Sequence, residues 1–382
     1  MKRSINPARV VVKLGTNVLS VREEWSKAIP LSSGRKLSSG SVDLAYLYTM
    51  AQQVSELRAL GKQVILVTSG AIGMGARELG IHSKVTGVEQ RQACAAIGQP
   101  LLMQEYRAAF DVYGLTVAQV LITRDVMNNR TSYNNLRNAV ENLLSLGVIP
   151  IFNENDAVST DEIGSAFGDN DQLSALVASK IDAELLVILS DIDGLYSQDP
   201  KVNPEAQLLK TVNQITPDIY ALAGDRGSEF ATGGMKTKIK AVEIARDAGC
   251  PVILTHGRIP QVLIKIIEGE EIGTLFLPAE PLRNRTRWLK NAKPSGSITI
   301  DQGALEAIRN KRSLLPKGIT EVKGSFQKNQ VILVNQVAHV LCPFSSEELK
   351  QIMGKHSDEI RSILGSDAKE LIARPEDMVF LD

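Results

Sequence analysis

Short runs of β-branched and aliphatic residues recur along the first 277 residues, and each is followed by a polar turn and a stretch with helical periodicity. The runs lie at 10–12, 64–67, 115–122, 148–152, 185–189 and 252–254. Continuous apolar character is typical of strands that are covered on both faces of a parallel sheet. Strands that alternate with helices predict βαβ units, so we expect a three-layer α/β/α fold with a mostly parallel sheet.

The pattern changes after about Leu277. The segment 283–293 holds five basic and no acidic side chains, and it lies between Pro281 and Pro294. From Gly296 onward, short β-rich runs are separated by turns and a helix or two, which predicts a small, β-rich domain. We therefore expect a large α/β domain over 1–277, a basic linker over 278–295 and a small domain over 296–382.

The composition narrows the class of protein. A chain of 382 residues predicts two or three domains, and 43% hydrophobic with 23% charged residues is close to the average for soluble globular proteins. The 43 basic and 43 acidic residues cancel, so no general attraction to nucleic acid or anionic lipid is expected. No apolar run is long enough to span a membrane, and the first residues lack the apolar core of a signal peptide, so we expect a cytoplasmic protein.

Polar side chains gather where the predicted strands end. Lys13 follows Val10–Val12, and Ser190 and Asp191 follow the run that ends at Leu189. Further polar ends are Ser69, Asn155 and Asp156, and the glycine-rich turn 232–238 carries Lys238. The carboxyl ends of parallel strands form one edge of the sheet, where ligands bind. Two lysines, carboxylates and glycine turns at one edge favour phosphoryl transfer, which needs positioning and positive charge.

The sequence does not match the common motifs for dinucleotide, P-loop, calcium or zinc binding. A dinucleotide fingerprint would need glycine at Glu78, and both Gly-Lys pairs lack the Ser or Thr of a Walker A loop. The segments that begin at Asp169 and Asp191 start like a calcium-binding loop but lack its later ligands. Three scattered cysteines support neither a disulfide framework nor a zinc site, so we assign no metal ligand. For Asp169 and Asp171, helix capping and ligand binding both remain open.

Five motifs in this order resemble the amino acid kinase family. They are Val11–Thr16, Val67–Ala71, Asn153–Ala157, Gly168–Ala175 and Thr232–Lys238. The C-terminal part resembles a PUA domain, so the resemblance covers essentially the whole chain. It implies that ATP, with Mg²⁺, phosphorylates the side-chain carboxylate of L-glutamate to give glutamyl 5-phosphate, the first step of proline biosynthesis.

The resemblance also implies roles for individual residues. Lys13 and Lys238 would hold the ATP phosphates and stabilise the transferring group, and Asp191 would orient the two lysines. Ser69, Asp156 and Asn170 would bind glutamate. The nucleotide-binding residues would be Lys13, Ser190, Asp191, Thr232, Gly233, Gly234, Met235, Lys236, Thr237 and Lys238.

Three features depart from the family pattern or leave alternatives open. Ser190 stands where threonine is common, although it keeps a hydroxyl group. Lys236 stands where a small polar residue is usual, so the lysine that acts at this turn stays undecided, and the segment Ser20–Gly40 is longer than usual. The resemblance implies a homo-oligomer, feedback inhibition by proline and delivery of the product to a glutamyl phosphate reductase. The alternatives are a family member with another substrate, and RNA binding through the PUA-like domain. The near-neutral charge of 296–382 argues against RNA, although the basic segment 283–293 leaves it open.

Overall fold

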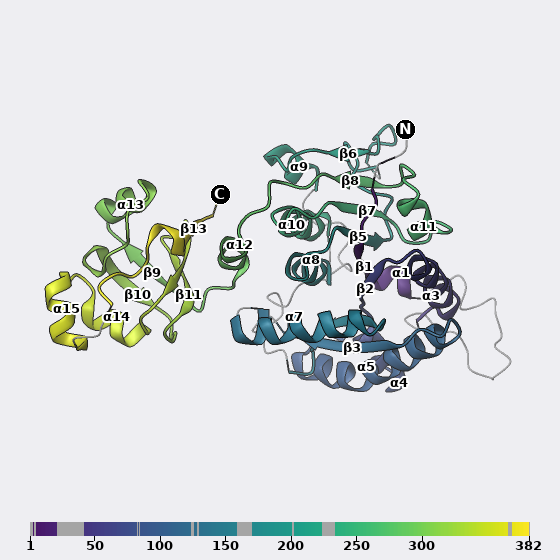
Figure 1. Ribbon diagram of the computed structural model, residues 1–382, viewed down its shortest axis with the longest axis horizontal. Coiled ribbons are helices and arrows are strands. Elements are labelled where there is room, and N and C mark those ends of the chain that lie inside the picture. Colours follow the sequence, from purple (N-terminus) through teal and green to yellow (C-terminus); the bar gives the residue numbers. More distant parts are fainter. Residues whose placement is uncertain are drawn as a thin grey trace. The chain divides into compact units, whose positions relative to one another are not determined.

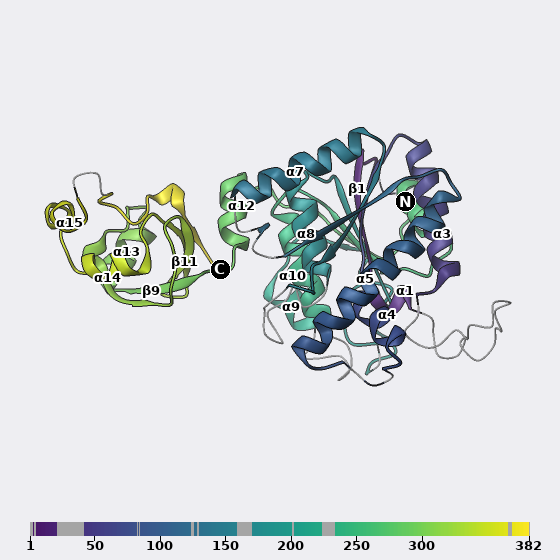
Figure 2. The ribbon, with the colours of Figure 1, turned by 90° about the horizontal axis from the view of Figure 1, so that it is seen from below.

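The structure is a computed structural model. It describes residues 3, 5–20, 42–81, 83, 85–123, 126–127, 130–158, 170–200, 202–223, 234–365 and 369–381. The chain forms two compact units, unit 1 over Met1–Pro281 and unit 2 over Leu282–Asp382. Each unit has its own sheet, drawn in Figures 1 and 2.

Unit 1 is built around an eight-stranded sheet of order β3-β4-β2-β1-β5-β7-β8-β6. Its strands are β1 (Arg9–Leu14), β2 (Gln63–Val67), β3 (Val117–Ile122), β4 (Ile149–Glu154), β5 (Leu185–Ser190), β6 (Thr211–Val212), β7 (Val252–His256) and β8 (Thr274–Phe276). All pairings are parallel except that of β7 with β8. The expected mostly parallel sheet is confirmed. The short strands β6 and β8 were not predicted, because two or three residues carry no periodicity.

Helices cover both faces of this sheet. They are α1 (Thr16–Leu19), α3 (Leu44–Ala59), α4 (Ala71–Glu78), α5 (Val88–Asp111), α7 (Arg130–Ser145), α8 (Asn170–Lys180), α9 (Pro217–Leu222), α10 (Met235–Arg246) and α11 (Val262–Ile267). Figure 1 shows α8 and α10 on one side of β5 and β1, with α1, α3 and α11 on the other. Because strand side chains alternate, Val10 and Val12 pack toward α3 and α11, whereas Val11 packs toward α8 and α10. Lys13 shares the face of Val11.

Helix α5 is continuous across Gly98 and Pro100, although glycine and proline close together often interrupt a helix. Gly98 is needed for close packing against α4. A Cβ atom placed on Gly98 would lie 1.8 Å from the Ala71 carbonyl oxygen and 2.5 Å from the Gly75 nitrogen. The glycine therefore lets two helices touch at their backbones, and it does not mark a break.

Unit 2 contains a five-stranded sheet of order β10-β9-β11-β12-β13. Its strands are β9 (Gly296–Ile300), β10 (Ile319–Lys323), β11 (Gln330–Val334), β12 (Ala338–Cys342) and β13 (Met378–Phe380). Its helices are α12 (Asn284–Asn291), α13 (Gln302–Arg309), α14 (Ser346–Ile352) and α15 (Ser357–Leu364), with 3₁₀ turns at Pro316–Gly318 and Pro375–Asp377. The small β-rich C-terminal domain is thus present as a separate body.

The basic segment 278–295 contains the helix α12. Leu289 is fully buried in a cluster with Ala292 and Val331, and the Leu289 carbonyl oxygen lies 2.8 Å from Nδ1 of His339 on β12. Arg285 forms an ion pair with Asp377. The segment was expected to be a linker from its charge and prolines, but its apolar residues attach it to the sheet of unit 2.

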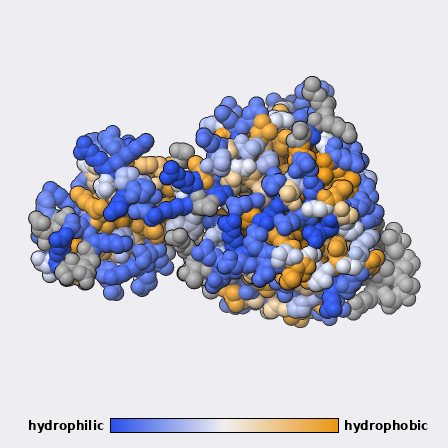
Figure 3. All heavy atoms as spheres, in the orientation of Figure 1, coloured by the Kyte–Doolittle hydropathy of each residue, from blue (hydrophilic) through white to orange (hydrophobic). Residues whose placement is uncertain are grey.

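Figure 3 shows hydrophilic and hydrophobic residues interspersed on the visible face of each unit. Across the described ranges, no helix combines the length and the apolar character that crossing a membrane requires.

Candidate active site

The carboxyl ends of three neighbouring strands bring the predicted site residues together. β1 lies between β2 and β5, with Lys13 in register with Val67 and Ile188. Ser69 follows the end of β2, and Ser190 is the last residue of β5. In open α/β sheets this edge is where ligands bind, and these predicted site residues share it.

Two buried lysines meet at one carboxylate. Nζ of Lys13 lies 2.7 Å from Oδ1 of Asp171, and Nζ of Lys238 lies 3.0 Å from Oδ2 of the same residue. The exposed fractions of these side chains are 2% for Lys13, 7% for Lys238 and 0% for Asp171. Asp171 is in the first turn of α8, and Lys238 is one turn into α10, which packs beside α8. Both helices cover the sheet face toward which Lys13 points.

Charge keeps Asp171 ionised although it is buried. Burial alone would raise the pKa of its carboxyl group, but the charges of Lys13 and Lys238 and their hydrogen bonds outweigh burial and hold the pKa below its usual range. The three groups form a buried triad, which we call the lysine–aspartate triad, with a net charge of plus one. Such a triad positions two cations firmly, which an anionic phosphoryl group requires.

A cluster of amides lies next to this triad. Nδ2 of Asn170 donates to Oγ of Ser69 at 3.1 Å and to Oδ1 of Asn153 at 2.8 Å, and it also donates to the Thr68 carbonyl. Nδ2 of Asn153 in turn donates to Oε1 of Gln99 at 2.7 Å. Ser69 and Asn170, both expected at the substrate, are therefore in direct contact. The network fixes their rotamers, as recognition of a small polar ligand requires.

Asp156 lies in the turn that follows β4 and is partly buried. Burial raises the pKa of its carboxyl group above the usual value, while the positive charge of Arg91 on α5 opposes the shift. A cation bound next to this carboxylate would stabilise its ionised form, because the ion pair would offset the free-energy cost of burying the charge.

Asp191, which directly follows β5, is held by two side-chain donors. Nδ2 of Asn17 donates to Oδ2 of Asp191 at 2.9 Å, and Oγ of Ser190 donates to Oδ1 at 3.0 Å. Burial would raise the pKa of Asp191, but these hydrogen bonds, with a smaller contribution from the charge of Lys238, bring it below its usual value. The resemblance assigned the orientation of both lysines to Asp191. In the structure, Asp171 is the carboxylate that bridges them, because α8 places it between β1 and α10.

The glycine-rich stretch is described only in part. Thr232 and Gly233 lie outside the described residues, as do Asp169 and most of the segment Ser20–Gly40. Gly234 caps the N-terminus of α10, and Met235, Lys236, Thr237 and Lys238 form its first turn. Lys236 is exposed whereas Lys238 is buried in the triad, so the two lysines that the sequence left undecided differ in their surroundings.

The sequence analysis did not assign several residues that contact the predicted site residues in the structure. Asp171 was left between two roles, and Asn17, Asn153 and Gln99 were not assigned to the site. Asp171 had a usable signal: two lysines in apolar surroundings need a buried counter-charge, and Asp171 begins a helix whose next turns are apolar. Gln99 had no such signal, because its contact with Asn153 depends on how α5 packs.

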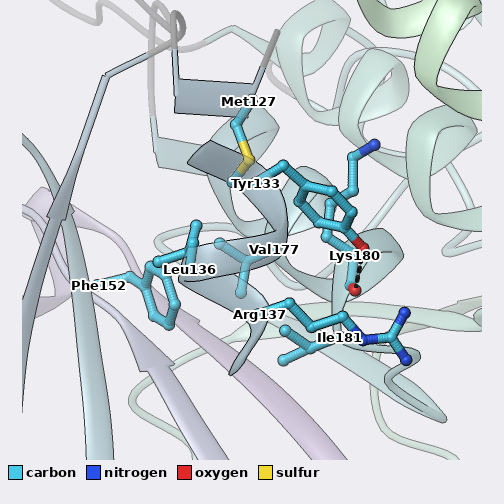
Figure 4. Close-up of a pocket in the computed structure, with 8 residues that line it drawn as sticks. All are labelled: Met127, Tyr133, Leu136, Arg137, Phe152, Val177, Lys180 and Ile181. Carbon is cyan, nitrogen blue, oxygen red and sulfur yellow. Dashed lines mark hydrogen bonds between the residues drawn. The ribbon is translucent and has the colours of Figure 1, made fainter. Parts of the chain in front are cut away.

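A separate pocket lies between α7 and the C-terminal end of α8, as Figure 4 shows. It is lined by Met127, Tyr133, Leu136, Arg137, Phe152, Val177, Lys180 and Ile181. Its cations already have partners: Arg137 lies 2.7 Å from Asp182, and Nζ of Lys180 lies 4.7 Å from the centre of the Tyr133 ring. Asp171 is at the other end of α8, roughly 14 Å away along the helix. This pocket is not the candidate active site.

Within the ranges that the structure describes, no group of three or more His, Cys, Asp or Glu side chains could hold a metal ion. Both oxygens of Asp171 already face ammonium groups. The described side chains therefore do not form a metal cage of their own.

Comparison with known proteins defines the class to which this site belongs. Residues 8–256 match the model of the amino acid kinase family, and residues 296–364 match the PUA domain. The chain belongs to the amino acid kinase family.

Individual relatives cover nearly its whole length. The chain is 44% identical over 379 residues to the glutamate 5-kinase of Methanosarcina barkeri, a match that covers 98% of this chain and 97% of that protein. It is 43% identical over 385 residues to the glutamate 5-kinase of Methanosarcina mazei, covering 100% of this chain and 97% of that protein. With the glutamate 5-kinase of Geobacter sulfurreducens it shares 42% identity over 381 residues, or 98% of this chain and 97% of that protein.

Proposed function

We propose that the chain transfers the terminal phosphoryl group of ATP to the side-chain carboxylate of L-glutamate. The observation that carries the proposal is the lysine–aspartate triad, which holds two ammonium groups at the carboxyl edge of the sheet beside the amide cluster of Ser69 and Asn170. The similarity to glutamate 5-kinases along 98% of the chain supports glutamate as the acceptor.

The chemistry suits the groups present. A glutamate carboxylate with a reference pKa near 4.3 is ionised at neutral pH, so no general base is needed to form the nucleophile. The bond from a carboxylate oxygen to the γ-phosphorus forms while the bond to the β,γ-bridging oxygen breaks, and ADP leaves. Repulsion between the two anions is the main obstacle. At about 4 Å and an effective dielectric constant near 20, one ammonium is worth about 4 kcal/mol against one phosphate charge before desolvation.

We assign roles on this basis. Lys13 and Lys238 stabilise the transferring group, and Asp171 holds both ammonium groups in place. Ser69 and Asn170 bind glutamate together with Asp156, whose carboxylate pairs with the α-ammonium group. On the nucleotide side we place Ser190, Asp191 and the stretch Thr232–Lys238.

Mg²⁺ would enter with ATP. The described residues offer no cage for it, and Mg²⁺ in kinases is held mainly by substrate phosphates with one or two carboxylates. When bound, it would neutralise part of the triphosphate charge.

The partners follow from the same resemblance. Proline carries an α-carboxylate and an α-ammonium group as glutamate does, so inhibition by proline would act through recognition of these groups beside Asp156. The product is a labile acyl phosphate, which a glutamyl phosphate reductase would consume. The resemblance further supports a homo-oligomer.

The substrate is tested by trapping the acyl phosphate. With ATP, Mg²⁺ and hydroxylamine, the purified chain should form a hydroxamate from L-glutamate, and much less from L-aspartate or N-acetyl-L-glutamate. Preference for either of the other two acids would point instead to a different acceptor within the family. No hydroxamate from any of them would contradict the proposed phosphorylation of a carboxylate.

The lysine assignment is tested by a matched pair of variants. Lys238→Ala should lower kcat by at least about a hundredfold and change the KM for glutamate little, because its charge acts on the transferring group. Lys240→Ala removes an exposed ammonium on the same helix, outside the stretch assigned to the nucleotide, and serves as the control, with kcat within about threefold of the wild type. Equal effects of the two substitutions would refute the assignment.

A further inference from the structure

Arg258 follows strand β7 at the same edge of the sheet as the candidate active site. β7 pairs with β5 in parallel, with His256 beside Ser190, and the Gly257 N–H donates to the Ser190 carbonyl at 2.8 Å. No role at this site was expected for Arg258 from the sequence. Its position next to Ser190 and Asp191 makes its contacts relevant to the nucleotide side.

The guanidinium of Arg258 makes a dense set of contacts with α1 and α3. Nη2 donates to the carbonyl oxygens of Val18 at 2.8 Å and Ser20 at 3.1 Å. Nη1 lies 2.5 Å from Oδ2 of Asp43, and the guanidinium carbon is 5.0 Å from the centre of the Tyr46 ring. With exposed fractions of 14% for Arg258 and 9% for Asp43, this pair is largely shielded from water. One side chain thus ties the end of α1 to the start of α3.

Further contacts hold the end of α1 next to the start of α3. The Asp43 N–H donates to the Leu19 carbonyl at 2.6 Å, and Ser20 forms an isolated antiparallel bridge with Val42. A Cβ atom placed on Gly257 would lie 2.6 Å from Cγ1 of Val18, so α1 packs directly on the backbone before Arg258.

Helix α1 needs such contacts because it has only one turn. A helix of four residues, Thr16–Leu19, has no stability of its own in water. At its N-terminal side the Gly15 N–H donates to the Leu189 carbonyl at 3.1 Å, and the Asn17 amide donates to Asp191 at 2.9 Å. Arg258 therefore holds one end of α1, while Asn17 in the same turn holds Asp191.

We propose that Arg258 is a positioning residue for the nucleotide side of the site. It fixes α1, and α1 presents the Asn17 amide that orients the Asp191 carboxylate. Arginine suits this task because its planar fork reaches two carbonyls and a carboxylate at once, which a lysine ammonium on a flexible stem does not. The inference rests on the proposed function insofar as Asp191 serves the nucleotide.

The first test measures α1 directly and needs no substrate. In Arg258→Lys, hydrogen exchange of the amides of Leu19 and Ser20, which donate to Gly15 and Thr16 within α1, should be at least about tenfold faster than in the wild type. The control is Arg137→Lys, which alters a more exposed ion pair with Asp182 and should leave this exchange unchanged. Unchanged exchange in folded Arg258→Lys would overturn the inference.

The second test measures how loss of the Arg258 contacts changes the KM values for ATP and glutamate. Arg258→Lys should raise the KM for ATP by about fivefold or more, with the KM for glutamate within about twofold. In an Asn17→Ala background the same substitution should change the KM for ATP by less than about twofold, because the connection to Asp191 is already broken. Equal rises in the KM values for ATP and glutamate would show a merely structural role and refute the proposal. The proposal would also be refuted if Arg258→Lys raised the KM for ATP as much in the Asn17→Ala background as in the wild type.

Two further measurements distinguish failure of this inference from misfolding of the variant and from failure of the proposed function. If Arg258→Lys does not fold, Asp43→Asn carries the same tests, since it removes the charge facing Arg258 but keeps an oxygen for the Tyr46 N–H. If the wild type shows no glutamate-dependent turnover, the proposed function fails, and the dissociation constant for ATP replaces KM. The exchange result then still decides whether Arg258 holds α1.

Discussion

Replacing Asp171 by asparagine tests the lysine–aspartate triad most severely. The substitution keeps the shape of the side chain but leaves two buried ammonium groups facing a neutral amide. With ion-pair distances of 2.7 Å and 3.0 Å, Coulomb's law at an effective dielectric constant near 20 gives about 6 and about 5.5 kcal/mol before desolvation. Desolvation offsets much of this attraction, and removal of one partner from a buried ion pair typically costs about 3–5 kcal/mol.

We therefore expect Asp171→Asn to lower the free energy of unfolding by about 3–5 kcal/mol and to lower kcat strongly. Equilibrium unfolding in urea, followed by circular dichroism, measures the first effect. Asp182→Asn is the matched control. Its partner Arg137 is also 2.7 Å away, but the exposed fractions of 35% and 52% predict a loss below about 1 kcal/mol. A loss in Asp171→Asn as small as that of the control would refute the reasoning.

A triple variant separates stability from activity. In Lys13→Met with Asp171→Leu and Lys238→Met, the whole triad becomes apolar, and no charge is left without a partner. Such replacements are often neutral or stabilising, so stability should return to within about 2 kcal/mol of the wild type while activity stays lost. Recovery of activity would mean that the triad does not act in catalysis.

The sign of the pH dependence follows from the lowered pKa of Asp171. A carboxyl group whose pKa is lower in the folded than in the unfolded state stabilises the fold above its unfolded pKa of about 3.9. This contribution is lost as the pH falls through the folded value. The difference in stability between the wild type and Asp171→Asn should therefore stay constant between pH 7 and pH 5.

Three further predictions concern other parts of the molecule. Asp156→Ala should raise the KM for glutamate about tenfold or more with little change in kcat, as steady-state kinetics would show, because it removes the proposed partner of the α-ammonium group. Gly98→Ala should lower the melting temperature sharply, since its Cβ would lie 1.8 Å from the Ala71 carbonyl oxygen, whereas Gly303→Ala, with its nearest neighbour at 3.5 Å, should not. Cys250 is buried and its pKa is raised to about 12 by burial, so a thiol reagent at pH 8 should label it only after unfolding.

The sequence predicted the sheet and the strand ends well because their signals are local. Runs such as Val10–Val12 identify buried strands directly, and the alternation of strands with helices specifies the topology class. From this it follows that Lys13 and Ser190 lie at one edge.

The identity of the bridging carboxylate could not be predicted in the same way. Asp171 at a helix start is equally suited to cap the helix or to pair with a cation, and the choice depends on α8 standing between β1 and α10. The resemblance implied this role for Asp191, which in the structure accepts hydrogen bonds from Asn17 and Ser190.

The helix within the basic segment could not be predicted for a related reason. Its prolines and charges are typical of a linker, while the burial of Leu289 depends on the sheet of unit 2. Short elements such as α12 and β8 are stabilised by tertiary contacts, so their sequences alone carry little signal.

The most direct test of the central claim is the stoichiometry of the reaction. ADP release and hydroxamate formation should be measured together in the presence of ATP, Mg²⁺ and hydroxylamine, with and without L-glutamate. We predict that both products depend on glutamate and form in equal amounts. ADP release that is unaffected by glutamate, or that occurs without hydroxamate, would contradict phosphoryl transfer to the glutamate side chain.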